Sequence, residues 1–92
     1  MIKHVNGKND KKSVFLYTLS TCVWCKKTKQ LLIDMGIKYD YIDVDLLVGA
    51  DQDKVMKELS NVNPQGGFPT ILINKVKTIV GFQPDAIREA LL

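Results

Sequence analysis

The 92-residue chain is 46% hydrophobic and 25% charged, has two cysteines and carries a formal net charge of +3. A chain of this length forms one modest core and is too short for two domains. No apolar run approaches the roughly 20 residues of a membrane span, and two cysteines exclude a disulfide-dense secreted scaffold. Residues 1–7 lack an apolar signal-peptide core, so we expect a cytoplasmic protein with no membrane partner.

The positive charge is concentrated in residues 1–12, where four lysines face one acidic residue. Proteins that bind nucleic acids usually carry a basic stripe along a face or a helix, so we expect a solvated basic tail and no nucleic-acid partner. A tail that does bind nucleic acid is the alternative, and its affinity would depend strongly on salt. Ile2–Val5 before Asn6-Gly7 indicates a second alternative for this segment, an extra hairpin strand.

The first half of the chain predicts a strand, a helix and a second strand. Ser13–Thr18 is a short β-branched and aromatic run. Cys22–Met35 has apolar residues at three- and four-residue steps, and the glycine that follows suits a helix end. Ile37–Val44 alternates as a strand, but its phase slips between Tyr41 and Ile42, as when a strand bulges or leaves the sheet.

The second half predicts a helix, a hairpin and a terminal helix. Asp51–Ser60 has acidic residues in its first turn and then one apolar face. Thr70–Ile73 and Val76–Val80 are short strands separated by Asn74-Lys75, which is typical of a two-residue hairpin turn. Pro84–Leu91 begins with proline and an acidic residue, as helices often do.

The resulting order, β-α-β-α-β-β-α, defines an α/β fold. A β-α-β start requires parallel strands joined by a right-handed crossover, and the β-β-α end adds an antiparallel edge. We therefore expect a four-stranded mixed sheet flanked by three helices over residues 13–92. An additional strand from residues 1–12 would extend that sheet.

The two cysteines form the motif Cys22-Val23-Trp24-Cys25, at the point where the first strand passes into the first helix. Free N–H groups and the helix dipole favour a thiolate at a helix N-terminus. Three residues apart on a helix, the two sulfurs lie close enough to bridge. Cys22 is the expected exposed nucleophile and Cys25 the resolving thiol, while Lys26 adds positive charge that favours the thiolate.

Other interpretations of the cysteines are weaker. A structural disulfide closing so short a loop stabilises by only about 2 kcal/mol on the chain-entropy model. Zinc normally takes four ligands, and His4 in the tail is the one other candidate, so we expect no metal site in one chain. A homodimer that shares a metal ion or an iron–sulfur cluster remains an alternative. Asp43 and Asp45 are interpreted as the end of a strand, not as an acid–base pair.

The Cys-x-x-Cys motif at a helix start, Phe68-Pro69 before a strand and Gly81-Phe82 after the hairpin together resemble the glutaredoxins of the thioredoxin superfamily. The resemblance covers residues 13–92 and implies a thioredoxin-like fold and dithiol–disulfide oxidoreductase activity. It also implies that Pro69 is cis and lies against the cysteines. Phe68 would then offer backbone hydrogen bonds to a bound peptide or to glutathione.

Three positions depart from the glutathione-dependent pattern. Leu19 stands where those glutaredoxins have a lysine, Val23-Trp24 replaces Pro-Tyr, and Gly81 is followed by Phe82 where they have a second glycine. With Cys-Val-x-Cys at residues 22–25 and Gly-Phe-x-Pro-Asp at residues 81–85, the chain looks more like the glutaredoxin-like redoxins that supply electrons to ribonucleotide reductase and are re-reduced by thioredoxin reductase. A glutathione-dependent glutaredoxin is the alternative.

The resemblance thus implies a monomeric electron carrier whose partners are a disulfide-containing protein, such as ribonucleotide reductase, and a reductase. No cofactor is expected beyond the redox-active Cys22–Cys25 pair. Substrate contacts are expected from an apolar ring around the cysteines, which suits a protein partner. The members of the ring are Trp24, Phe68, Phe82 and Pro84. The residues expected to bind the substrate are Trp24, Phe68, Pro69, Gly81 and Phe82.

Overall fold

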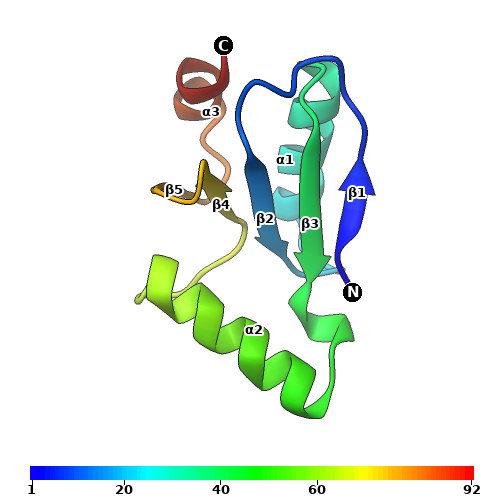
Figure 1. Cartoon of the computed structure of the whole chain (residues 1–92), viewed down its shortest axis with the longest axis vertical. Coiled ribbons are helices and arrows are strands. Elements are labelled where there is room, and N and C mark those ends of the chain that lie inside the picture. Colours follow the sequence, from blue (N-terminus) through cyan, green and yellow to red (C-terminus); the bar gives the residue numbers. More distant parts are fainter.

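A computed structural model describes residues 1–92 as a five-stranded mixed sheet with three α-helices (Figure 1). In chain order the elements are β1 (Lys3–Val5), β2 (Val14–Thr18), α1 (Val23–Asp34), β3 (Tyr39–Asp43), the 3-10 helix η1 (Val44–Leu46), α2 (Gly49–Val62), β4 (Thr70–Ile73), β5 (Lys77–Val80) and α3 (Pro84–Leu91). The predicted order β-α-β-α-β-β-α is confirmed, and one further strand precedes it.

The strands lie in the order β1-β3-β2-β4-β5. Only β2 and β3 are parallel, and α1 joins them, as the sequence predicts. The other neighbouring pairs are antiparallel. Because β2 and β3 run in the same direction, their carboxyl ends meet at one edge of the sheet, the lower edge in Figure 1. The cysteine motif follows β2 at that edge.

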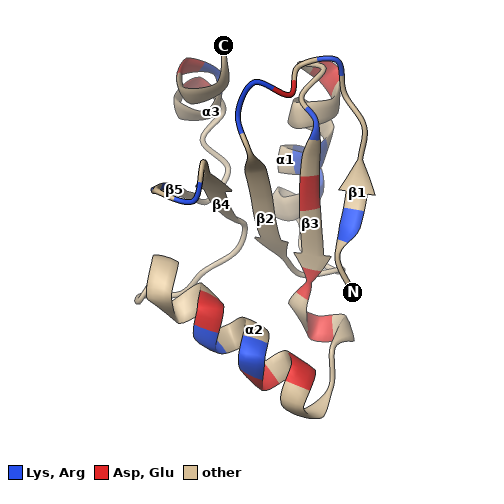
Figure 2. Cartoon of the chain, viewed as in Figure 1, with Lys and Arg blue, Asp and Glu red and all other residues tan.

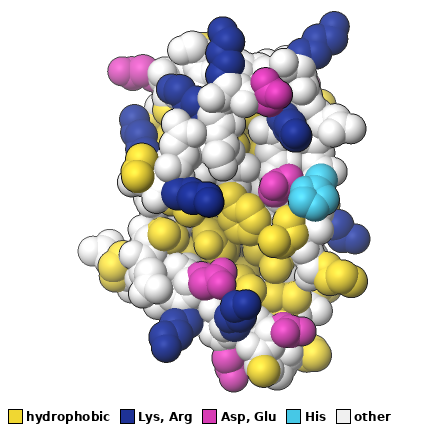
Figure 3. Space-filling model, viewed as in Figure 1, with side chains coloured by type: hydrophobic (Ala, Val, Ile, Leu, Met, Phe, Trp, Pro, Cys, Tyr) yellow, Lys and Arg dark blue, Asp and Glu magenta, His cyan; other side chains and the backbone are white.

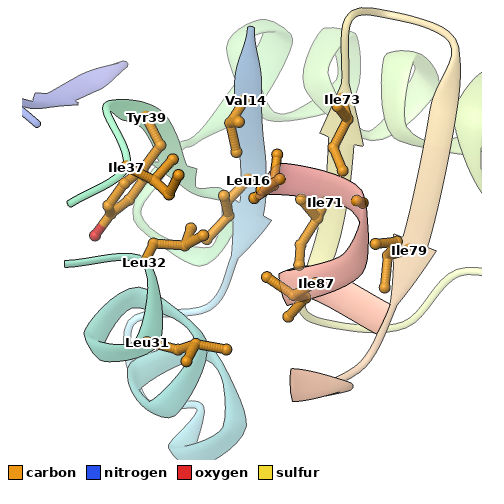
Figure 4. Packing of buried hydrophobic residues seen from close by; sticks show 12 residues of the cluster. Val14, Leu16, Leu31, Leu32, Ile37, Tyr39, Ile71, Ile73, Ile79 and Ile87 are labelled. Carbon is orange, nitrogen blue, oxygen red and sulfur yellow. The ribbon is translucent and has the colours of Figure 1, made fainter. Parts of the chain in front are cut away.

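Helices α1 and α3 cover one face of the sheet, and α2 packs on the other. The larger buried cluster joins Leu16 of β2 and Ile71 of β4 to Leu32 of α1 and Ile87 of α3 (Figure 4). All four side chains are fully buried. On the opposite face a smaller cluster consists of Tyr17, Ile42, Val44 and Leu59. Strand β2 therefore contributes to both cores through alternate residues.

Strand β3 also faces both cores, and this explains the phase slip in its sequence. Tyr39 belongs to the larger cluster, whereas Ile42 belongs to the smaller one. Its pairing with β2 is unbroken from Asp40 to Asp43, so the predicted bulge is wrong. The alternation of apolar and polar residues along β3 is blurred because a central strand is apolar on both faces. Directly after Asp43 the chain leaves the sheet and forms η1.

The N-terminal segment supplies the extra strand, but with an unexpected partner. Strand β1 pairs antiparallel with β3 and not with β2, which follows it in the chain, so the expected hairpin is absent. Both edges of β2 are taken by β3 and β4, and β1 pairs with the outer edge of β3. Beyond the strand, the N–H of Asn9 donates to Gly36 O at 2.9 Å. The lysines of this segment are spread over β1 and the following loop (Figure 2).

Two predicted turns are confirmed by their backbone angles. Asn74 and Lys75 have φ values of 52° and 62°, which define a two-residue hairpin turn of the primed type. Gly36, with φ of 71°, follows Met35 at the end of α1. These left-handed conformations occur where the sequence places turn-forming residues.

Part of the sheet face beside α2 is uncovered. Hydrophobic atoms gather there between the upper strands and the helix (Figure 3). A hollow of about 340 Å³ on this face is lined in part by Phe15, Tyr17 and Leu72. None of the helices combines the length and the apolar composition that crossing a membrane would require.

Candidate active site

Cys22 occupies the N-cap of α1, directly after the loop that leaves β2. Its backbone is extended, with φ of −85° and ψ of 117°, and its Sγ accepts a hydrogen bond from the N–H of Cys25 at 3.1 Å. The sulfur thus takes the place of the oxygen that usually caps a helix. The free N–H groups and the positive end of the helix dipole face this sulfur, an arrangement that suits a negatively charged atom.

Cys25 lies one turn into α1 and is fully buried, whereas Cys22 is partly exposed. Burial, together with the hydrogen bond to Cys22, raises the pKa of Cys25 to about 12. Both cysteines are free thiols in this structure. The pair therefore combines one thiol that an external disulfide can reach with one that only its neighbour can reach.

The aromatic residues predicted around the cysteines come together beside Cys22. Trp24 is 54% exposed and stacks on Phe82, with ring centroids 5.9 Å apart and planes inclined by 23°. A hollow of about 290 Å³ is lined by Trp24, Phe68, Gly81 and Phe82. Pro84 begins α3 and is not among these lining residues. The sequence thus predicted the members of the hollow but not the stacking between the two rings.

Phe68 and Pro69 form the segment that leads into β4. The peptide bond between them is cis, and Pro69 is fully buried. The carbonyl oxygen of Pro69 accepts a hydrogen bond from the N–H of Gly81 at 2.8 Å, which ties this segment to the end of β5. The backbone N–H and C=O of Phe68 make no hydrogen bond within the chain. They are free to pair with an extended chain laid along the hollow.

Besides Lys26, whose effect on the thiolate stays a prediction, the structure brings a second lysine, Lys29, to the helix face of the buried thiol. Lys26 is exposed and its ammonium makes no hydrogen bond or ion pair. Lys29 is only 20% exposed, forms an ion pair with Asp43 at 3.3 Å and lowers the pKa of Cys25 against the effect of burial. The proximity of Lys29 to Cys25 could have been predicted from the sequence, because a spacing of four residues places both side chains on one face of the helix.

A second contact missed from the sequence holds the loop before Cys22. The N–H of Ser20 donates to Asp45 Oδ1 at 2.8 Å, and its hydroxyl donates to Oδ2 at 2.5 Å. These bonds lower the pKa of Asp45. Asp45 lies in η1, so the loop after β2 is linked to the segment after β3. The sequence spacing of Ser20 and Asp45 contains no sign of this contact, which depends on the pairing of the two strands.

His4 lies on β1, where its Nδ1 is 2.7 Å from Asp40 Oδ1. It was the one other metal-ligand candidate in the sequence, and it is engaged on the sheet. No group of three or more His, Cys, Asp and Glu side chains within the chain is placed to hold a metal ion. The alternative of a carried metal or cluster therefore needs ligands from a second copy.

The mixed sheet with its three helices is a thioredoxin-like fold, and the cysteine pair at the start of α1 defines the class of protein as a thiol oxidoreductase. Residues 14–77 match the family model described as Glutaredoxin, and the chain belongs to the glutaredoxin family.

Solved structures show the same relationship. A glutaredoxin from Methanosarcina mazei is 49% identical, covering 98% of this chain and 86% of its own, with a TM-score of 0.88. Methanoredoxin from Methanosarcina acetivorans is also 49% identical, with 89% and 86% covered and a TM-score of 0.85. The NrdH-redoxin of Escherichia coli, a glutaredoxin-like protein described as having a thioredoxin-like activity profile, is 26% identical. Its alignment covers 84% of this chain and 92% of that one, with a TM-score of 0.62.

Proposed function

We propose that the protein is an electron carrier that reduces disulfide bonds in other proteins through Cys22 and Cys25. The Cys22 thiolate attacks a substrate disulfide, forming a Cys22–substrate mixed disulfide and releasing one substrate sulfur as a thiolate. Cys25 loses its proton and attacks Cys22 Sγ, releasing the second substrate thiolate and leaving a Cys22–Cys25 disulfide. Two electrons thereby pass to the substrate, and a reductase must return two electrons to the carrier.

One observation carries this proposal: the accessible sulfur caps α1, and a buried thiol lies directly behind it. The Sγ of Cys22 accepts the N–H of Cys25 at 3.1 Å, so the two residues are in contact before any disulfide forms. Complete burial protects Cys25 from external disulfides. It therefore reacts after the mixed disulfide brings an electrophilic sulfur to it.

The surroundings of Cys22 favour a polypeptide substrate. The free backbone groups of Phe68 can pair with an extended strand, and the hollow between Trp24 and Phe82 offers apolar surface for one side chain. Trp24 is half exposed although it is large and apolar, which is typical of a surface that binds a protein partner. Ribonucleotide reductase, predicted from the resemblance, is one target with this chemistry.

Thioredoxin reductase is the proposed electron donor. Leu19 offers no positive charge to a carboxylate of glutathione, and Phe82 fills a position where glutathione-dependent relatives have glycine. The thioredoxin-like activity profile described for the NrdH-redoxin of Escherichia coli agrees with this direction. A reducing compartment such as the cytoplasm, predicted from the sequence, is where such a dithiol carrier would function.

Replacing each cysteine separately tests the proposed roles. Cys22→Ser should abolish reduction of a peptide disulfide, because no accessible thiolate remains. Cys25→Ser should retain the first attack and accumulate the mixed disulfide, since nothing resolves it. Mass spectrometry of the quenched protein measures the adduct, and absorbance of the released thiol measures turnover.

Thr21→Ser, a change in the exposed residue next to Cys22, is a matched control that should behave as the wild type. Full disulfide-reducing activity in Cys22→Ser would contradict the proposal. So would equal amounts of mixed disulfide on Cys22 and on Cys25, because that result requires both thiols to be accessible.

A further inference from the structure

The buried thiol presents a chemical problem that the paired cysteines do not solve by themselves. Cys25 must lose its proton to resolve the mixed disulfide, yet burial raises the pKa of Cys25 to about 12. The hydrogen bond from Cys25 N–H to Cys22 Sγ stabilises charge on the outer sulfur, not on the inner one. A positive charge behind Cys25 would make its ionisation less costly.

We propose that Lys29 is the positioning residue that makes Cys25 able to resolve the mixed disulfide. This inference rests on the proposed function. Lys29 follows Cys25 by four residues on α1, so their Cβ atoms lie about 5–6 Å apart on one face of the helix. Its ammonium is the partly buried one, whereas Lys26 and Lys27 of the same helix are exposed.

The ammonium of Lys29 is held in place from β3. Its Nζ lies 3.3 Å from Asp43 Oδ1 and 3.8 Å from the centre of the Tyr41 ring. The hydroxyl of Thr18, a fully buried residue of β2, donates to the same Asp43 oxygen at 2.6 Å. The flexible lysine is therefore held by two residues of β3, one of which is itself held by Thr18 of β2.

The charged and titratable groups around Cys25 leave Lys29 as the source of positive charge. On α1 these groups are Cys22 and Lys29. A hydrogen bond with the backbone of Leu19 lowers the pKa of Cys25, and the positive charge of Lys29 lowers it further. From β3 the facing groups are Asp43 and Tyr41, which contact the ammonium itself. β2 contributes only the neutral hydroxyl of Thr18. Asp43 is not among the groups that shift the pKa of Cys25, whereas its partner Lys29 is.

The two steps can be timed separately with an aromatic disulfide, 5,5′-dithiobis(2-nitrobenzoate). In the first phase Cys22 displaces one coloured thiolate and forms a mixed disulfide, at a rate that depends on reagent concentration. In the second phase Cys25 attacks Cys22 Sγ and displaces the other thiolate, at a rate independent of concentration. Stopped-flow absorbance at several pH values yields a pH profile for each phase.

Lys29→Met keeps the aliphatic stem and removes the charge. If the pKa of Cys25 rises by about one unit, the thiolate fraction falls tenfold, and the greater nucleophilicity of a more basic thiolate returns about half of that on a logarithmic scale. The second phase should therefore slow about threefold below pH 8, with its pH profile displaced upward, while the first phase is unchanged. Lys29→Arg should retain the rate and the pH profile of the second phase. In the exposed control Lys26→Met, the second phase should match that of the wild type.

Removing Lys29 also leaves Asp43 without its partner, which is a structural effect. The double variant Lys29→Met/Asp43→Asn removes that unpaired carboxylate, and it should show the same slow second phase. Two results would overturn the inference. One is an unchanged second phase in Lys29→Met. The other is a second phase in Lys29→Arg that is as slow as in Lys29→Met while its pH profile stays that of the wild type. Loss of the first phase in the wild type would instead contradict the proposed function.

Discussion

The two sulfur atoms differ in their access to water more than in their place along the chain. Cys22 lies at the surface end of α1 and Cys25 one turn inside, so a four-residue motif spans the boundary between solvent and core. The residues that support them are polar and short: Ser20 before Cys22, and Thr18 behind Lys29. The chemistry therefore depends on side chains that do not themselves react.

Asp45 provides a test at this scale, because hydrogen bonds from Ser20 lower its pKa below the ordinary value of 3.8. A carboxyl group whose pKa is lowered on folding stabilises the protein above its unfolded pKa, and the effect is lost as the pH falls through the folded pKa. Asp45 is fully exposed, so the contribution should be small. We expect the thermal midpoint of the wild type to fall more steeply than that of Asp45→Asn below pH 4.

Melting curves between pH 5 and pH 2.5 measure this difference. Asp53→Asn, which removes an exposed carboxylate of α2 without a hydrogen bond, is the matched control and should follow the wild type. Parallel acid dependence in Asp45→Asn and the wild type would show that the contact with Ser20 does not persist in solution.

The extent to which the site could be predicted also differs residue by residue. Cys22, Cys25 and Trp24 follow from a local motif at the start of a helix, so the sequence was sufficient for them. Lys29 and Asp45 act through contacts with other elements of the fold, and their charges look like those of any surface residue. The predicted effect of Lys26 on the thiolate stays a prediction.

At the scale of elements, strand and helix bounds were largely predictable because each element has its own local signals. Thr70–Ile73 and Pro84–Leu91 have the predicted bounds, since a hairpin turn and an N-terminal proline mark them. The partner of β1 was not predictable, because pairing depends on which sheet edge is free after the other strands assemble. The blurred alternation of Ile37–Val44 has a similar origin in its central position.

Gly7 tests the docking of the N-terminal segment. A methyl group on Gly7 would lie 2.5 Å from Lys38 N and 2.6 Å from Gly36 O, so the backbone must move. Gly7→Ala should lower the free energy of unfolding by about 1–3 kcal/mol, the usual cost of overpacking. Because the clash separates the segment from β3, the amides of β1 should also lose protection from hydrogen exchange.

Gly36→Ala is the matched comparison, because its cost has a different source. Nothing lies within 4 Å of a Cβ at Gly36, but its φ of 71° is unfavourable for alanine. A loss of about 1–2 kcal/mol is expected, with the protection of β1 retained. Wild-type protection of β1 in Gly7→Ala would contradict the docking described for this segment. Urea denaturation and hydrogen exchange measure the two effects.

At the scale of the whole molecule, the sheet brings to one end residues that lie far apart in the chain. Phe68 precedes β4 and Phe82 follows β5, and both line one hollow with Trp24, which lies at the start of α1 after β2. Charged residues are not gathered in this way, because acidic and basic residues are mixed along α2 (Figure 2). We therefore expect partner selection near Cys22 to depend on apolar shape and free backbone groups more than on a single strong electrostatic field.

This arrangement predicts which reductant the protein accepts. Glutathione is small and carries two carboxylates, and Leu19 provides no charged hydrogen bond to either of them, a loss of about 1.5–3 kcal/mol or tenfold or more in affinity. A flavin reductase instead presents a polypeptide to the hollow beside Trp24. We expect oxidised protein to consume NADPH at least about tenfold faster with thioredoxin reductase than with glutathione and glutathione reductase.

Leu19→Lys sharpens the comparison, because it restores the positive charge without changing the cysteines. This variant should gain glutathione-dependent turnover, whereas its turnover with thioredoxin reductase should change little. Lys27→Met, which removes an exposed charge from the surface beside Trp24, separates a local effect of Leu19→Lys from a general effect of net charge. Fast turnover of the wild type with glutathione alone would show that neither Leu19 nor Phe82 excludes this reductant. The glutathione-dependent alternative would then replace thioredoxin reductase as the electron source of the same dithiol.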